Sequence, residues 1–144
     1  MPDSIAETLT EDHRRCDHLL ALVESAADGD DWGRLTPEVR AFTEAMERHF
    51  AFEEERLFPS LESAAPMAAG PAGVMRMEHR QMRQLLGDLQ AAAESRDRQE
   101  CLGVLDTLHL AIQQHNAKEE AILYPLADRT LGSAVTELLA GFQG

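Results

Sequence analysis

The sequence predicts an all-α fold: an up-down-up-down four-helix bundle with a short fifth C-terminal helix and an internal two-fold repeat. Three observations lead to this prediction. Apolar residues recur every three or four positions along most of the chain, as they do on one face of a helix. Aromatic residues make up only 5% of the sequence, and no stretch alternates apolar and polar residues for long, so strands are disfavoured. The connections between the predicted helices are short, which favours antiparallel neighbours.

The first two helices are predicted over residues 4–27 and 36–59. The second is expected to start at Thr36, because Thr-Pro-Glu places a capping residue before a proline at the first helical position. It is expected to end or kink at Pro59. The apolar stripe of the first helix comprises Ile5, Leu9, Cys16, Leu20 and Val23, and that of the second comprises Val39, Phe42, Met46, His49, Glu53 and Leu57.

Two more long helices and a short one follow. The third is predicted over about 70–94, and the fourth opens with the capping-box pattern Asp97-x-x-Glu100 and is expected to stop at Pro125. The stripe of the third is Met75, His79, Met82, Leu85 or Leu86, and Leu89; that of the fourth is Cys101, Leu105, Leu108, Ile112, His115 and Glu119. The short fifth helix carries Leu131, Val135, Leu138, Leu139 and Phe142 on one face.

The two halves of the chain repeat each other. His13 aligns with His79, and 79 − 13 gives a shift of 66 residues. The same shift aligns His49 with His115, Glu53 with Glu119, Phe58 with Tyr124, and Pro59 with Pro125. In a bundle, this repeat predicts a pseudo-two-fold axis along the bundle and places the first helix diagonal to the third.

Histidines and glutamates interrupt the apolar stripes at repeated positions. His49 and Glu53, like His115 and Glu119, stand four residues apart and therefore share one helix face. His13 and His79 lie in the stripes of the first and third helices. A buried carboxylate costs several kcal/mol unless a cation neutralises it. Four imidazoles and two carboxylates in one layer of the core therefore indicate a metal site.

The number of candidate ligands fits two metal ions. Two histidines for each ion and two bridging carboxylates give each ion about four protein ligands, and a bridging oxo or hydroxo group leaves one position open. Mixed nitrogen and oxygen ligation without thiolate suits iron or manganese, with zinc as another option. Open positions on adjacent redox metals point to a small ligand: dioxygen, peroxide or nitric oxide.

The order His, His-x-x-x-Glu-Glu-x-x-Leu-Phe-Pro, His, His-x-x-x-Glu-Glu-x-x-Leu-Tyr-Pro resembles the hemerythrin-like (HHE cation-binding) domain family. The resemblance also includes Asp12-His13-Arg14 and Glu78-His79-Arg80, and it covers almost the whole chain. It implies a non-haem di-iron site in a four-helix bundle, with two iron ions joined by an oxo or hydroxo bridge, ahead of manganese or zinc. The implied metal ligands are His13, His49, Glu53, His79, His115 and Glu119, with the glutamates as bridges.

The sequence departs from oxygen-carrying hemerythrin at two positions. Arg83 stands where that group has a second histidine, and Glu119 stands at the i+4 spacing where that group has aspartate one residue later. One imidazole is therefore missing, which argues against reversible oxygen carriage. The pattern is similar to a subgroup that includes bacterial proteins with peroxide- or nitric-oxide-directed activity and the repair-of-iron-centres proteins.

The leading functional hypothesis is a di-iron protein that binds or reacts with peroxide, dioxygen or nitric oxide in oxidative or nitrosative stress, including a catalase-like reaction. It needs no catalytic residue beyond the metal ligands. A second hypothesis is a binding protein that stores or donates iron, or senses oxygen or redox state. A third is a structural bundle that holds a redox-inert ion such as zinc.

Charge and composition limit the partners. The 144 residues include 26 acidic and 13 basic side chains, for a net charge of −13. Such an acidic chain is repelled by nucleic acid and by anionic membranes. With no apolar run long enough to span a bilayer and an acidic N-terminal segment, we expect a cytoplasmic protein. We expect residues 1–144 to form one domain, as a monomer or weak homodimer.

Several further polar residues have two interpretations. We expect His18 and His109 to lie on the surface or behind the ligands, and Cys16 to fill the core rather than bind metal. The helical rise places Cys101 too far along the bundle for a disulfide with Cys16.

Residues one turn from the ligands, or adjacent to them, also need an interpretation. One hypothesis pairs Asp17 with Arg83 in a salt bridge above the metals. We expect Tyr124 to pack at the end of the bundle, as Phe58 should, with a radical site or a terminal ligand as the alternatives. Glu54 and Glu120 are expected to point away from the ligand face, where they orient a histidine or face water.

Overall fold

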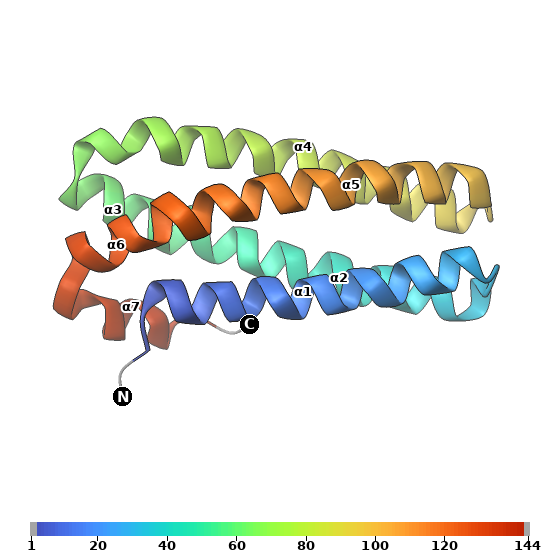
Figure 1. Ribbon diagram of the computed structural model, residues 1–144, viewed down its shortest axis with the longest axis horizontal. Coiled ribbons are helices and arrows are strands. Elements are labelled where there is room, and N and C mark those ends of the chain that lie inside the picture. Colours follow the sequence, from blue (N-terminus) through green and yellow to red (C-terminus); the bar gives the residue numbers. More distant parts are fainter. Residues whose placement is uncertain (1–2, 143–144) are drawn as a thin grey trace.

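Four long helices form an antiparallel bundle in the computed structural model, which describes residues 3–142 (Figure 1). They are α1 (Ile5–Asp28), α2 (Trp32–Phe52), α4 (Ala69–Glu94) and α5 (Arg98–Lys118). Helix α1 packs mainly against α2 and α5, and α4 packs against the same two helices, so α1 lies diagonal to α4. The predicted all-α bundle and the diagonal placement are confirmed.

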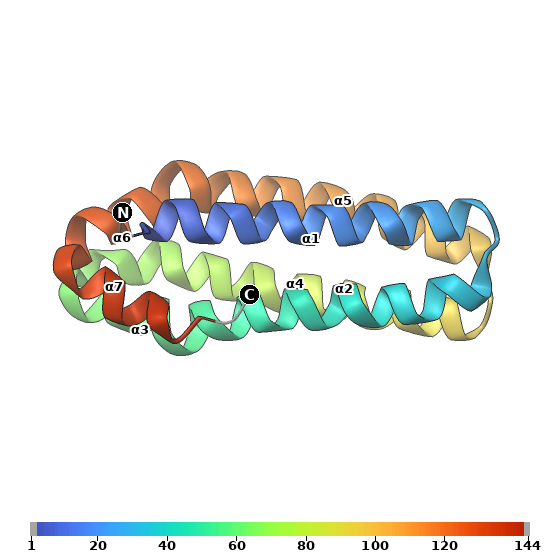
Figure 2. The same ribbon diagram turned by 90° about the horizontal axis from the view of Figure 1, so that it is seen from below.

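Shorter elements gather at one end of the bundle, on the left in Figures 1 and 2, opposite the α1–α2 and α4–α5 turns. They are the π-helical turn η1 (Glu53–Leu57), α3 (Phe58–Ala64), η2 (Pro66–Ala68), the π-helical turn η3 (Glu119–Leu123), α6 (Tyr124–Leu131), η4 (Gly132–Ala134) and α7 (Val135–Ala140). Helix α7 is the predicted short C-terminal helix.

Side-chain caps mark the starts of three of the long helices, α1, α2 and α5. The Asp97 carboxylate accepts a hydrogen bond from the Glu100 backbone N–H at 3.1 Å, as the capping pattern predicts. The predicted start of the second helix at Thr36 is wrong. Asp31 caps this helix by accepting from the Arg34 N–H, so α2 begins at Trp32 and Pro37 lies inside it. Pro37 costs one helical hydrogen bond and does not begin the helix.

The helices continue beyond Pro59 and Pro125, so the expected stop at Pro125 is wrong, as is the first of the two outcomes, an end or a kink, expected at Pro59. A proline ring clashes with the carbonyl four residues earlier and has no N–H to donate to it. Here a π-helical turn precedes each proline, and the helix continues beyond it as α3 or α6. The Phe58 N–H donates to the Glu53 carbonyl, five residues back. The wide turn accommodates the proline, and it recurs at the same position in both halves.

The core consists of two apolar clusters along the bundle axis with a polar layer between them. One cluster, nearer the α1–α2 turn, includes Leu20 and Phe42, and the other, nearer α6, includes Leu9 and Leu57. The buried polar residues of the layer are Asp12, His13, His49, Glu53, His79, His115 and Glu119. Within residues 3–142, none of the helices combines the length and apolarity needed to cross a membrane.

Candidate metal centre

The six side chains predicted as metal ligands lie together in this buried layer. They form two groups of four, each with its ligand atoms within 4.8 Å of one another. Both groups contain Glu53 and Glu119. The first tetrad adds His13 and His49, and the second tetrad adds His79 and His115. The two glutamates thus stand between two pairs of histidines.

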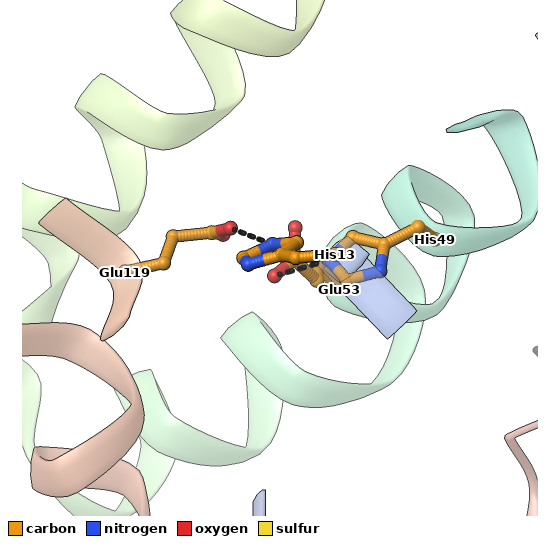
Figure 3. Close-up of side chains that lie close together, drawn as sticks. All are labelled: His13, His49, Glu53 and Glu119. Atoms are coloured by element: carbon orange, nitrogen blue, oxygen red, sulfur yellow. Dashed lines mark hydrogen bonds and ion pairs between the residues drawn. The ribbon is translucent and has the colours of Figure 1, made fainter. Parts of the chain in front are cut away.

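The helices aim all four Nε2 atoms at the two carboxylates. In the first tetrad, His13 Nε2 lies 3.1 Å from Glu119 Oε1, and His49 Nε2 lies 3.3 Å from Glu53 Oε2. Figure 3 shows Glu119 and His49 approaching this tetrad from opposite sides, with His13 between them.

The second tetrad has the same arrangement. His79 Nε2 lies 3.0 Å from Glu53 Oε1, and His115 Nε2 lies 3.2 Å from Glu119 Oε1. Both glutamate side chains are fully buried. The arrangement can bind metal in either tetrad, with the glutamates shared.

Each histidine is oriented by a further carboxylate from another element. An ionised carboxylate only accepts hydrogen bonds, so Nδ1 carries the proton and donates, and Nε2 is directed to the centre. The pairs are His13 Nδ1 with Glu120 at 2.8 Å, His49 Nδ1 with Asp12 at 2.6 Å, His79 Nδ1 with Glu54 at 2.6 Å, and His115 Nδ1 with Glu78 at 2.9 Å.

These four carboxylates obey the repeat, since 78 − 12 and 120 − 54 both equal 66. Glu54 and Glu120 therefore orient histidines, one of the two roles the sequence left open. No such role was expected of Asp12 and Glu78 from the sequence. The signal was present, because an acidic residue directly precedes the histidine in both Asp12-His13 and Glu78-His79. Only the fold shows that each acid serves the histidine of a neighbouring helix.

Tyr124 also lies in the centre, so the expectation that it packs at the end of the bundle is wrong. Its buried hydroxyl is 2.6 Å from Glu53 Oε2 and 2.9 Å from Glu119 Oε1. It lies 3.1 Å from Nε2 of both His13 and His49. The repeat counterpart Phe58 is buried in the apolar cluster and stacks on the His79 ring at 5.9 Å.

Four buried polar atoms of the second tetrad form no hydrogen bond of acceptable direction in the described part of the chain, although His79 Nε2 lies only 3.0 Å from Glu53 Oε1. They are Glu53 Oε1, His79 Nε2, His115 Nε2 and Glu119 Oε2. Unpaired buried polar groups are rare and costly, and a cation bound between these nitrogen and oxygen atoms would satisfy them together. The donor set contains no thiolate, which suits iron, manganese or zinc. The residues present therefore fit a metal ion.

Burial and mutual attraction shift the pKa values of these groups. Burial disfavours charged His49, but the Glu53 carboxylate and the Asp12 hydrogen bond outweigh it and raise the His49 pKa well above 6.5. Burial opposes charge on Glu53 also, yet His49 holds the Glu53 pKa well below 4.5. Despite burial, Glu119 raises the pKa of His115 to about 8. Without metal, protons on His49 and His115 therefore offset the charge of the carboxylates, and a metal ion would displace these protons.

The predicted salt bridge between Asp17 and Arg83 is absent from the described residues. Arg83 instead donates to Glu47 at 2.8 and 2.9 Å and to Glu54 at 2.8 Å. Asp17 lies on α1 beside Gln113 of α5. The two partners belong to diagonal helices and face opposite sides of the bundle, which keeps them apart.

His18, His109 and Cys16 lie where they were expected from the sequence. His18 is exposed, and His109 is half-exposed and pairs with Glu24 at 3.3 Å. Cys16 belongs to an apolar cluster, where burial raises the pKa of its thiol to about 12, and it stays protonated at neutral pH. It is not a member of either tetrad.

Comparisons with known proteins agree with this geometry. The hemerythrin HHE cation-binding domain matches residues 4–127, which include all six residues of the two tetrads. Comparison with curated proteins and with solved structures returns no match. The match extends over most of the chain, and the chain therefore belongs to the hemerythrin HHE cation-binding domain family.

Proposed function

We propose that the protein binds two iron ions, one in each tetrad, bridged by Glu53 and Glu119. The observation that carries this proposal is that both tetrads contain the same two buried glutamates. A carboxylate shared in this way holds two ions close together, as a dinuclear centre requires. The four orienting carboxylates support it, because they fix each imidazole with Nε2 towards the centre.

We further propose that the loaded centre reacts with hydrogen peroxide, dioxygen or nitric oxide. Paired iron ions with open positions supply redox chemistry on such small molecules. The chain's own contribution is to hold the ligands rigidly, to exclude bulk water from a layer of buried side chains, and to keep protons on Nδ1 of each histidine. No nucleophile or separate acid–base residue is required.

Metal analysis followed by rapid mixing tests this function. Protein loaded with ferrous iron and then oxidised should contain two ions per chain and show near-ultraviolet charge-transfer absorption. Stopped-flow mixing with peroxide, dioxygen and nitric oxide should then change that spectrum for at least one of the three. Oxygen release from peroxide would establish the catalase-like reaction. A chain that takes up zinc and no iron would contradict the proposal and favour a structural ion.

The position of Tyr124 supports a role as an additional ligand in the first tetrad. Its hydroxyl is within 3.1 Å of four of the atoms that would surround the ion. Burial and the nearby Glu119 and Glu53 carboxylates raise the Tyr124 pKa well above 10, so only a bound cation would favour the phenolate. A visible phenolate-to-iron band that disappears in Tyr124→Phe would establish the ligand.

A further inference from the structure

A pocket of about 240 Å³ on the α1–α5 face reaches one of the candidate ligands, His13. It is lined by Asp17 of α1, by Gln113 and Asn116 of α5, and by Glu120 of η3. We name it the entrance pocket. The His13 side chain is 5% exposed, the most among the four histidines. The pocket thus extends from the surface to the first tetrad.

The repeat-related face, between α2 and α4, is closed at the corresponding positions. A shift of 66 relates Asp17 to Arg83, because 83 − 17 is 66, and in the same way relates Asn116 to Phe50. The Arg83 guanidinium hydrogen-bonds to two glutamates and lies 5.3 Å over the Phe50 ring. Phe50 in turn stacks on His79 at 4.2 Å, and His79 is fully buried. A cation and an aromatic ring thus cover this side of the centre.

The two faces differ in charge as well. On the closed face, Arg83 offsets the carboxylates of Glu47 and Glu54. The entrance pocket has the opposite charge at the matching position, because Asp17 stands where the closed face has Arg83. Its lining includes the carboxylates of Asp17 and Glu120 and one cation, Arg14, so acidic groups still outnumber basic ones. Asp17 Oδ1 is shielded from solvent and has no hydrogen-bond partner in the described part of the chain. A recess with this charge attracts cations, admits neutral hydrogen-bonding molecules and repels anions.

Two other pockets are weaker candidates for access. The larger of these two pockets has a volume of about 620 Å³. It is lined by Thr8, Asp12 and Phe142 among others, and by none of the six candidate ligands. The Phe142 ring stands edge-on to His49 at 6.3 Å and covers that side. A pocket of about 80 Å³ reaches His115 but has a third of the volume of the entrance pocket.

We propose that small cationic or neutral hydrophilic species, such as a hydrated divalent metal ion or hydrogen peroxide, reach the metal centre through the entrance pocket, and that Arg83 closes the equivalent route on the opposite face. This inference rests on the proposed function, because it assumes that the two tetrads hold metal. Asp17 is a positioning residue in this scheme. Its short side chain leaves the entrance pocket open, and its carboxylate gives the pocket negative charge.

Chemical modification of the metal-free protein tests the route without any metal. Diethyl pyrocarbonate acylates accessible histidine rings, and peptide mass spectrometry reports each ring separately. His18 and His109, which lie on the surface, serve as internal references. We expect His13 to react more slowly than these two but much faster than His79. Equal rates for His13 and His79 would overturn the proposal.

The double variant Asp17→Arg/Gln113→Glu introduces the arginine and glutamate of the closed face at the corresponding positions of the entrance pocket. The new arginine can pair with Glu120 and with the new glutamate, as Arg83 pairs with Glu54 and Glu47. The double variant changes the net charge of the protein by +1. The matched control is Asp106→Asn, which makes the same change on the exposed surface of α5. Of these two proteins, we expect only the double variant to slow His13 modification towards the rate of His79, because the new ion pairs cover the pocket while Asn116 remains where the closed face has Phe50. An unchanged His13 rate in the folded variant would overturn the proposal.

The reverse variant Arg83→Asp/Glu47→Gln/Phe50→Asn keeps the inference testable if the first variant fails to fold. It removes from the closed face both the guanidinium and the ring that stacks on His79, and it should make His79 reactive, with His13 unchanged. Circular dichroism checks that each variant is folded. A His79 ring that stays unreactive in this folded variant would contradict the role of Arg83.

Uptake of Co²⁺ by metal-free protein, followed by its visible absorption, tests passage of a cation. In Asp17→Arg/Gln113→Glu, we expect uptake to slow by about tenfold, because the steering charge is reversed, with the same amount of cobalt bound at the end. The same rate as in Asp106→Asn would contradict the proposal. If the parent protein binds no cobalt and no iron, the proposed function fails, and the acylation pattern still decides the route.

Discussion

The two tetrads have the same residue types, two histidines and the two shared glutamates, but different surroundings. In the first tetrad, the Tyr124 hydroxyl lies 2.6 Å from Glu53 Oε2 and contacts both histidines. In the second, the counterpart is Phe58, and four buried polar atoms have no partner among the described residues. The histidine nitrogens of the first tetrad thus have a hydroxyl partner, and those of the second, His79 Nε2 and His115 Nε2, do not.

This difference teaches that the repeat fixes ligand positions but not ligand chemistry. The histidines, the glutamates and the orienting carboxylates follow the two-fold relation. Three of the pairs that differ near the centre are Tyr124 against Phe58, Asp17 against Arg83, and Asn116 against Phe50. Tyr124 and Asn116 make the surroundings of the first tetrad more polar, and Asp17 and Asn116 leave them more open. We expect two ions in such a centre to be inequivalent, with the more reactive one in the first tetrad.

The strongest test of the comparison replaces the shared carboxylates. Glu53→Gln and Glu119→Gln should each abolish metal binding at both tetrads, because each glutamate belongs to both. The measurement is metal content by mass spectrometry after loading. Glu55→Gln, an exposed residue in the same π turn, is the control and should bind normally. Retention of one full ion in either ligand variant would show that the tetrads are independent.

Exchange of the hydroxyl between the halves tests their difference directly. Tyr124→Phe should lower the unfolding free energy of the metal-free protein by about 1.5–3 kcal/mol, since it removes hydrogen bonds to buried carboxylates. Phe58→Tyr should raise it, because the new hydroxyl would meet the unpartnered atoms of the second tetrad. Urea unfolding in the presence of a chelator measures both values. Equal destabilisation by the two variants would refute the comparison.

The pH dependence of the metal-free protein compares His49 of the first tetrad with His115 of the second. Both folded pKa values lie above 6.5, so the folded state binds more protons than the unfolded chain. The stabilisation is complete below about pH 6.5 and is lost as pH rises through the folded pKa, about 8 for His115. The His115 share is about 2 kcal/mol.

The free energy of unfolding in urea, measured from about pH 6 to about pH 9, checks this expectation. NMR of the imidazole protons distinguishes the His49 ring from the His115 ring. Metal affinity should change in the opposite direction and rise with pH, because metal displaces these protons. Metal-free stability that stays constant or increases over this range would contradict the assignment.

The smallest expected change in stability concerns Asp128 and its repeat counterpart Glu62, which lie near the end of each half of the repeat. Asp128 accepts hydrogen bonds from the backbone N–H groups of Ile5 at 2.7 Å and Ala6 at 3.1 Å and so caps α1. Its counterpart Glu62 forms a partly exposed ion pair with Arg76 at 2.7 Å. Asp128→Ala should cost about 1–2 kcal/mol as a lost cap. Glu62→Ala should cost less than about 1 kcal/mol, as an exposed pair does. Thermal unfolding ranks the two variants, and the reverse order would contradict this comparison.

The bundle and the six candidate ligands could be predicted from the sequence because both depend on spacing. Helical stripes and the i+4 pairs His49–Glu53 and His115–Glu119 are local, and the 66-residue shift identifies corresponding positions without any fold. The role of Asp12 depends on a contact with His49 on another helix, which spacing alone does not reveal. The hypothesis for Asp17 and Arg83 failed for the same reason.

The end of each helix could not be predicted from the proline rule alone. Pro59 and Pro125 ordinarily stop a helix, and here each is accommodated by a π turn. Tyr124 directly follows the second π turn. The wrong expectation that the helix stops at Pro125 therefore led to the wrong expectation that Tyr124 packs at the end of the bundle. Sequence rules consider the local cost of a proline and do not include the tertiary contacts that repay it.

The two π turns also make the protein sensitive to changes in length. Each wide turn accommodates one residue more than an α-helical path of the same rise, so a single deletion within it would restore ordinary winding. Deletion of Ala121 from η3 would therefore leave the helix beyond it in nearly the same orientation, but the wide turn would be lost. The Pro125 ring would then meet the carbonyl one α-helical turn earlier, a clash that the wide turn avoids. Loss of one codon there would thus destabilise the helix beside the centre while every candidate ligand stays in the chain.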